Sequence, residues 1–278
     1  MKINKKTLQY CALYMKDFFK PSKNLIVVTF VYDNPRDCDV LCLNSIKRYS
    51  EKIGCDLSIS TEMAADLPQC SQWQKFQIYR KAIDGNYDKV LLLDADIIVT
   101  PRAPDIFKRI KKGIAFALDG FYTNPKELYR KSKGELNSGV LLACKDSFNF
   151  FSLTNYRKEE VFKRASNWGR KKEDGTKGWA DQDYFKEKVK DIPYFRTILS
   201  NLWNYQVYYN DFKDETRKKC KINRDKAYFI HYTKLKKYLV KHDYKHFFEK
   251  PKKPLLMFED ISTAIKLAKK KLLYGGVD

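Results

Sequence analysis

Two acidic residues, Asp94 and Asp96, interrupt a long apolar run and are the clearest sign of chemistry in this chain. Apolar residues at 90–93 precede them and residues 97–99 follow, a pattern typical of one buried strand over 89–99. Side chains at positions i and i+2 of a strand point to the same side, so we expect the two carboxylates to lie together. Two desolvated carboxylates repel each other, and a hard divalent cation would remove that cost and could hold a diphosphate. The alternative is a strand end whose acids simply reach solvent.

The segments around this pair alternate between expected strands and expected helices. Apolar and β-branched runs predict strands at 25–31, 57–60, 89–99, 114–118, 139–143 and 227–232. Helical spacing of apolar residues predicts helices at 1–20, 38–50, 73–83, 180–191 and 258–273. This alternation is typical of an α/β fold with a Rossmann-like, mainly parallel central sheet flanked by helices. Such sheets bind ligands beyond the carboxyl ends of their strands, which is where Asp94 and Asp96 lie.

Composition narrows the class of protein. The 278 residues carry a net charge of +21, which favours anionic partners such as nucleotides, nucleic acid or acidic lipid head groups, although simple solubility is an alternative. The seven cysteines are odd in number and irregularly spaced, so we expect neither a zinc cluster nor a disulfide ladder, and a reducing compartment fits best. We see no signal peptide and no run of about 20 apolar residues. We therefore expect a cytoplasmic protein, either soluble or peripheral at a membrane surface.

Further motifs lie before and after the acidic pair in a recognisable order. They are the strand at 28–33, Lys75, Asp94-Ala95-Asp96, Asp119, Asn137-Ser138-Gly139, Asp181-Gln182-Asp183, residues 202–204 and His231. In this order and spacing the chain resembles nucleotide-sugar glycosyltransferases of the glycosyltransferase A fold. It is most similar to family eight, which holds glycogenin and bacterial lipopolysaccharide galactosyltransferases. The resemblance covers roughly residues 24–240 and implies a catalytic domain there, between an N-terminal basic helix at 1–23 and a basic amphipathic helical extension at 241–278.

The resemblance implies a metal site with three protein ligands. Asp94 and Asp96 would bind Mn²⁺ or Mg²⁺ through carboxylate oxygens, and His231 would supply the third ligand atom. Imidazole suits manganese better than magnesium, so we expect Mn²⁺. The alternative for His231 is a core histidine at the end of a strand.

The same resemblance implies contacts to a nucleotide-sugar donor. Lys75 would contact the sugar or phosphate, Asp119 would reach sugar hydroxyls, and the side chains of Asn137 and Ser138 would shape the sugar pocket. The alternatives are a solvated helix face for Lys75 and an ordinary turn for the Asn-Ser-Gly motif. The family favours UDP over GDP and a hexose, glucose or galactose, as the sugar. The full donor-binding set is Thr29, Tyr32, Asp33, Lys75, Asp94, Ala95, Asp119, Asn137, Ser138, Asp181, Gln182 and Lys237.

Catalysis in the resembled family implies roles for Gln182, Asp181 and Lys237. Glutamine is a poor nucleophile, so Gln182 beside the anomeric carbon indicates a retaining, front-face transfer in which Asp181 holds a sugar hydroxyl. The alternative for the acids is the first turn of a helix, where they are favoured anyway. The family motif His-x-x-Gly-x-x-Lys places Lys237 on the phosphate, but Lys234 stands here where the family has glycine.

The acceptor is expected to be a glycan or another hydroxyl compound. Residues 165–179, bracketed by Trp168 and Trp179, could close over the donor, and the aromatic stretch at 202–209 either lines the acceptor cleft or belongs to the core. The basic C-terminal region could contact an anionic membrane. The rival classes are an aspartate-dependent phosphatase, a GDP-sugar enzyme and a basic nucleic-acid-binding protein, and we expect no specific nucleic acid. The sequence leaves the oligomeric state open.

Overall fold

A six-stranded sheet forms the centre of the described part of the chain. The computed structural model describes residues 22–31, 36–118, 136–153, 181–190, 195–207, 224–232 and 237–249. The strands follow the order β2-β1-β3-β6-β5-β7, and β6 alone runs antiparallel to its neighbours. The expected α/β class with a mainly parallel central sheet is therefore confirmed. The strands are β1 (Asn24–Thr29), β2 (Asp56–Ser60), β3 (Lys89–Asp94), β5 (Ile114–Leu118), β6 (Leu136–Cys144) and β7 (Arg196–Leu199).

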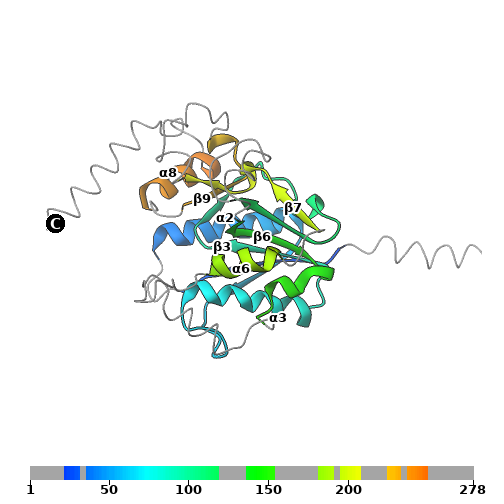
Figure 1. Ribbon diagram of the computed structural model, residues 1–278. Coiled ribbons are helices and arrows are strands. Elements are labelled where there is room, and N and C mark those ends of the chain that lie inside the picture. The colour runs from blue at the N-terminus through cyan, green and yellow to red at the C-terminus, as the bar shows by residue number, and fades with distance from the viewer. Residues whose placement is uncertain are drawn as a thin grey trace, which may run out of the picture.

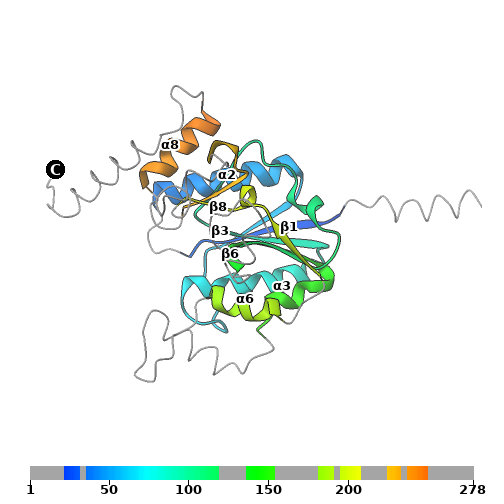
Figure 2. The ribbon, with the colours of Figure 1, turned by 45° about the horizontal axis from the view of Figure 1, so that its top comes forward.

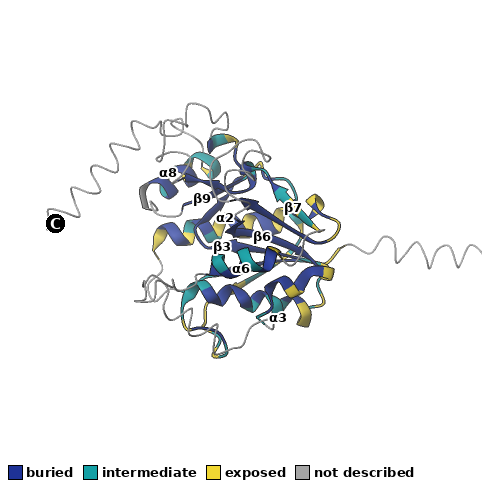
Figure 3. Ribbon diagram, in the orientation of Figure 1, coloured by how far each residue is buried: buried dark blue, intermediate teal, exposed yellow. Residues whose placement is uncertain are grey.

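Helices cover both faces of this sheet (Figures 1 and 2). On one face lie α3 (Gln77–Asp84) and α6 (Asp181–Lys190), and on the other lies α2 (Asp37–Ile53), against which α8 (Lys237–Phe248) packs. Successive strand residues point to opposite faces, so both faces need apolar side chains and the strands are continuous apolar runs. In β3, for example, Leu92 packs toward α3 and α6 while Leu91 packs toward α2. Figure 3 shows the resulting buried layer.

A second, three-stranded sheet lies beside the first. Its order is β4-β9-β8, formed by β4 (Ile97–Val99), β9 (Phe229–His231) and β8 (Tyr205–Gln206). The single strand expected over 89–99 is therefore wrong: β3 ends at Asp94, Ala95 and Asp96 form a turn, and β4 enters the other sheet. A carboxylate cannot stay inside a sheet that is buried on both faces, so the chain leaves the central sheet where the acids begin.

Two further expectations change in detail. The helix expected at 73–83 begins instead as the 3₁₀ helix η1 (Ser71–Phe76), which places Lys75 before α3. The strand expected at 139–143 begins earlier, so Asn137 and Ser138 lie inside β6 rather than in a turn. The remaining short helices are η2 (Ile106–Arg109), η3 (Lys145–Phe151), η4 (Asn201–Trp203) and η6 (Arg224–Lys226).

The expected helices at 1–20 and 258–273 lie outside the described residues. Among the helices of the described segments, none is both long enough and apolar enough to cross a membrane. The division at residues 23 and 240 stays a prediction. In the structure α8 runs across the second of these positions and packs on α2.

Candidate active site

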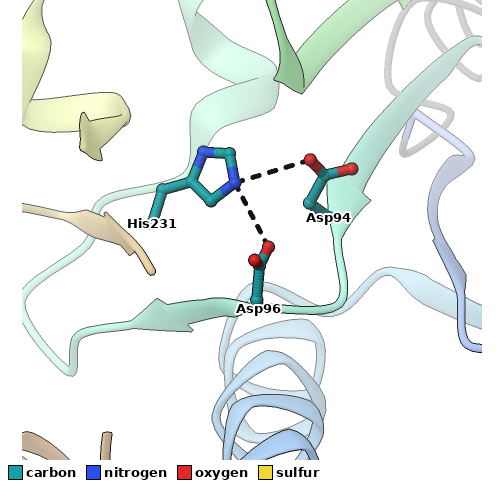
Figure 4. Close-up of side chains that lie close together, drawn as sticks. All are labelled: Asp94, Asp96 and His231. Atoms are coloured by element: carbon teal, nitrogen blue, oxygen red, sulfur yellow. Dashed lines mark ion pairs between the residues drawn. The ribbon is translucent and has the colours of Figure 1, made fainter. Parts of the chain in front are cut away.

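Asp94, Asp96 and His231 meet at one point between the two sheets (Figure 4). Asp94 ends β3, Asp96 lies in the following turn, and His231 ends β9. The His231 Nε2 atom lies 3.2 Å from an Asp96 oxygen and 3.5 Å from an Asp94 oxygen. One ligand atom from each residue lies within 4.8 Å of the other two. The structure therefore brings together the three residues that the sequence predicted as metal ligands.

Backbone pairing holds this meeting point. Ile97 pairs with His231 across β4 and β9, and the Tyr232 N–H donates to the Asp96 carbonyl at 3.0 Å. The sequence predicted that Asp94 and Asp96 lie on the same side of one strand, whereas in the structure a turn positions them. The turn still places both carboxylates beside the same imidazole.

The donor atoms suit a divalent cation. Two carboxylates offer hard oxygen ligands and the imidazole offers a nitrogen, a combination that accommodates Mn²⁺. All three side chains are at least four-fifths buried, so water alone does not offset the two negative charges. These residues fit the metal that the resemblance implies.

Lys75 is the positive centre of an adjoining cluster. Its Nζ lies 2.6 Å from an Asp94 oxygen and 2.7 Å from an Asp181 oxygen, and it donates to the Ser138 hydroxyl at 3.3 Å. The alternative of a solvated helix face is wrong, because the Lys75 side chain is only 10 % exposed. Lys75 thus ties β3, β6 and α6 together, and through Asp94 it joins the candidate metal site.

Burial and charge act against each other in this region. Burial alone would lower the pKa of His231, but the carboxylates of Asp96 and Asp94 raise that pKa above its ordinary value. Burial would also lower the pKa of Lys75, but the carboxylates of Asp181 and Asp94 outweigh burial and raise that pKa. Burial raises the pKa of Asp94, although Lys75 and His231 act in the opposite direction. The nearby carboxylates therefore stabilise the positively charged forms of His231 and Lys75.

Gln182 and Asn137 lie on the same edge. The Ser138 N–H donates to Gln182 Oε1 at 3.3 Å, which places Gln182 beside the Lys75–Asp181 pair. The oxygen of Asn137 accepts from the Gly139 N–H at 2.9 Å and from Asn204 Nδ2 at 2.8 Å. That oxygen is therefore already used within the protein, which the sugar-pocket role expected for Asn137 did not anticipate.

Two features of the site were missed from the sequence. Asn204 Oδ1 lies 3.1 Å from His231 Nδ1, whereas the sequence placed Asn204 in a stretch that either lines the acceptor cleft or belongs to the core. A Cβ on Gly139 would lie 2.5 Å from the His231 ring, so glycine is needed here for the close approach of the imidazole. The sequence shows only an asparagine between Trp203 and Tyr205, which gives no indication of the contact with His231.

The structure describes only some of the residues that we expected to bind the donor. Thr29 pairs with Asp94 in the register of β1 and β3, and within the described segments its buried hydroxyl has no hydrogen-bond partner. The neighbouring Ser60 hydroxyl, which the sequence did not single out, has none there either. Ala95 is buried in the turn. Tyr32, Asp33, Lys234, Asp119 and residues 165–179 lie outside the described residues, as does the side chain of Lys237, the first residue of α8.

A known protein family matches most of this chain. The family description "Glycosyl transferase family 8" matches residues 44–238. One similar solved structure is a glycosyltransferase involved in the glycosylation of the major capsid of PBCV-1, with 13 % identity over 74 % of this chain and 92 % of that chain and a TM-score of 0.48. Another is mouse xyloside xylosyltransferase 1 in its apo form, with 13 % identity, coverage of 76 % and 97 %, and a TM-score of 0.41. The comparison with curated protein sequences found no significant match.

Proposed function

We propose that this chain, which belongs to glycosyl transferase family 8, is a metal-dependent retaining enzyme that moves a hexose from a UDP-sugar to a hydroxyl acceptor. Family membership confirms the glycosyltransferase class and, with the observed sheet, the glycosyltransferase A fold. It also gives a role to buried acids that a nucleic-acid-binding protein would leave unexplained. The observation that carries the proposal is the convergence of Asp94, Asp96 and His231 beside the Lys75–Asp181 pair.

In this proposal Asp94, Asp96 and His231 hold a divalent ion, with Mn²⁺ preferred to Mg²⁺. Such an ion supplies positive charge where the donor diphosphate gains negative charge on leaving. Lys237 at the start of α8 adds a second positive charge, in the position implied by the family motif. Charge placed where the leaving group develops its own charge favours the transition state over the bound substrate.

The chemistry at the sugar belongs to Asp181 and Gln182. Lys75 Nζ lies 2.7 Å from the Asp181 carboxylate and holds it in place, where its oxygens can accept a hydrogen bond from a sugar hydroxyl. Gln182 is oriented by the Ser138 N–H, so its amide stands at the same edge without being a nucleophile. These two facts support a front-face transfer in which the acceptor attacks on the side from which the diphosphate leaves.

The nucleotide is assigned to the carboxyl ends of β1 and β2. The Thr29 hydroxyl, which has no hydrogen-bond partner within the described residues, belongs to the residue that pairs with Asp94 on the neighbouring strand. With Tyr32 and Asp33 it would contact the base and ribose. UDP is preferred to GDP because of the family, and a GDP-sugar is the alternative.

The proposal is tested by donor hydrolysis. Purified enzyme is given UDP-glucose, UDP-galactose and GDP-mannose, each with Mn²⁺ and again with EDTA. We expect release of UDP from one UDP-sugar with Mn²⁺ only, and no release by the Asp94→Asn variant. The Asp37→Asn variant, altered at the exposed acid that begins α2 and pairs with Lys241, is the matched control and should behave as wild type. Full activity with EDTA or in Asp94→Asn would refute the metal assignment.

Retention and location need separate measurements. Proton NMR of the freshly released sugar or of a transfer product should show the anomeric configuration of the donor. We also expect a cytoplasmic enzyme whose basic C-terminal region contacts an anionic membrane surface. Residues 250–278, which would make that contact, lie outside the described residues, so cosedimentation with anionic vesicles is the measurement to make.

A further inference from the structure

His231 is engaged at both of its ring nitrogens. Nε2 faces Asp94 and Asp96, while Nδ1, on the other side of the ring, lies 3.1 Å from Asn204 Oδ1. Neutral imidazole carries its proton on only one nitrogen, and only the other nitrogen can bind a metal. The partner of Nδ1 therefore decides whether Nε2 is available to an ion.

A series of hydrogen bonds that starts at the Gly139 backbone N–H determines which nitrogen of His231 carries the proton. The Gly139 backbone N–H can only donate, so the Asn137 atom 2.9 Å from it must be the oxygen. The Asn204 atom 2.8 Å from that oxygen must then be the donating Nδ2. The remaining Asn204 atom is Oδ1, which can only accept, so the proton between it and His231 belongs on Nδ1.

The surroundings prevent the donors and acceptors in this series of hydrogen bonds from exchanging roles. Asn204 is 1 % exposed and Asn137 and His231 are nearly as buried, so water does not compete for the bonds. The His231 ring lies against the α-carbon of Gly139, where even a methyl group would overlap it. A flip of either amide would place two acceptors or two donors face to face in a buried site.

We infer that Asn204, oriented by Asn137, is a positioning residue that holds His231 in its Nδ1–H form and so presents the Nε2 lone pair to the divalent ion. The inference rests on the metal role proposed above for His231. It gives Asn204 a task other than lining the acceptor cleft, and it gives the Asn137 oxygen one other than contact with the sugar. Partners of this kind are as much a part of a metal site as its ligands.

Direct binding of Mn²⁺, followed by the EPR signal of the free ion, tests the inference without any substrate. Asn204→Leu keeps the side-chain size but removes the acceptor, and we expect Mn²⁺ affinity to fall about ten- to hundredfold. Asn204→Asp should retain more of the affinity than Asn204→Leu, because a carboxylate still accepts from Nδ1–H. Asn201→Leu removes another buried amide, at the start of the same short helix η4, and should bind Mn²⁺ as wild type.

Wild-type affinity in Asn204→Leu, or an equal loss in Asn201→Leu, would overturn the inference. Failure of the wild-type protein to bind Mn²⁺ would instead overturn the proposed function, which keeps the two outcomes apart. If Asn204→Leu does not fold, nitrogen NMR of the wild-type protein with labelled histidine and saturating Mg²⁺ decides the matter. The chain has three histidines, and His242→Gln and His246→Gln identify the His231 signals. We expect a proton on Nδ1 alone, and a proton on Nε2 would contradict the inference.

Discussion

His231 and Tyr232 are neighbours in the chain, yet they face two different clusters of buried charge. His231 points between the sheets to Asp94 and Asp96, whereas Tyr232 points the other way, toward α8, where its hydroxyl donates to Asp243. Consecutive side chains at the end of a strand are expected on opposite sides. The same short segment therefore joins a candidate active site to a purely internal contact.

The cluster around Tyr232 is balanced in charge. Asp243 is fully buried and its carboxylate lies 3.0 Å from Arg224 Nε, so one negative charge meets one positive charge. Burial, and after it the Asp243 charge, raises the pKa of Tyr232 well above its ordinary value, so the phenol stays a neutral donor. The cluster fastens α8 to the end of β9 and has no need of a ligand.

The cluster around His231 is not balanced. Within the described segments, the three carboxylates of Asp94, Asp96 and Asp181 contact one lysine, Lys75, and one imidazole. A buried excess of negative charge is costly, and a divalent cation is the simplest remedy. Among the described residues, the contrast teaches that the candidate functional site is marked by an excess of buried negative charge, and not by buried acids alone.

The sharpest way to break this contrast is to remove one excess charge. Asp96→Asn should lower transfer by about a thousandfold or more, since the bound ion contributes several kcal/mol to the transition state. The metal-free protein should be as stable as wild type or more so, because repulsion between carboxylates is relieved. Steady-state kinetics and thermal unfolding in EDTA measure the two effects. A large loss of stability would mean that the acids are structural after all.

The balanced cluster should respond in the opposite way. Asp243→Asn removes the buried carboxylate that pairs with Arg224 and should cost about 3 kcal/mol of unfolding free energy, read from urea denaturation. Turnover per folded molecule should be nearly unchanged. Asp37→Asn on the exposed pair with Lys241, also a contact of α8, should change stability by less than about 1 kcal/mol. Equal effects of the two substitutions would remove the distinction between the buried and exposed pairs.

Gln182 sharpens the comparison within the site itself. Gln182→Ala should slow turnover about tenfold to a hundredfold, while UDP affinity measured by calorimetry stays the same, because the amide acts on the sugar and not on the nucleotide. An unchanged turnover number would remove Gln182 from the mechanism.

The smallest effect is expected at Thr29. Thr29→Val replaces a buried hydroxyl, unpartnered within the described residues, by a methyl group of the same size, so the unliganded protein should gain up to about 1 kcal/mol of stability. UDP should bind a few-fold more weakly if that hydroxyl contacts the nucleotide. UDP binding that is as tight as in wild type would exclude Thr29 from the donor site.

Much of the fold could be predicted from local patterns. Apolar runs identified the strands that became β1, β2, β5 and β9, and helical spacing identified α2 and α6. The antiparallel direction of β6 and the break at Ala95 were not predictable. The apolar pattern of a buried strand is the same whether the strand runs parallel or antiparallel to its neighbours. The apolar residues on both sides of Ala95 are likewise compatible with one continuous strand or with strands in two sheets.

The site shows the same division. Residue types and order singled out Asp94, Asp96 and His231, because their chemistry is visible in a sequence. The bond between Asn204 and His231 was not predictable, since it depends on where η4 and β9 meet in space. The contacts of Lys75 with Asp94 and Asp181 were missed for the same reason.

The most direct test of the central claim is the affinity of the protein for UDP, measured by calorimetry with Mn²⁺ and again with EDTA. If Asp94, Asp96 and His231 hold one ion that grips the diphosphate, UDP should bind tightly with Mn²⁺, and binding should be lost both with EDTA and in Asp96→Asn. UDP binding of equal strength under all three conditions would contradict the account.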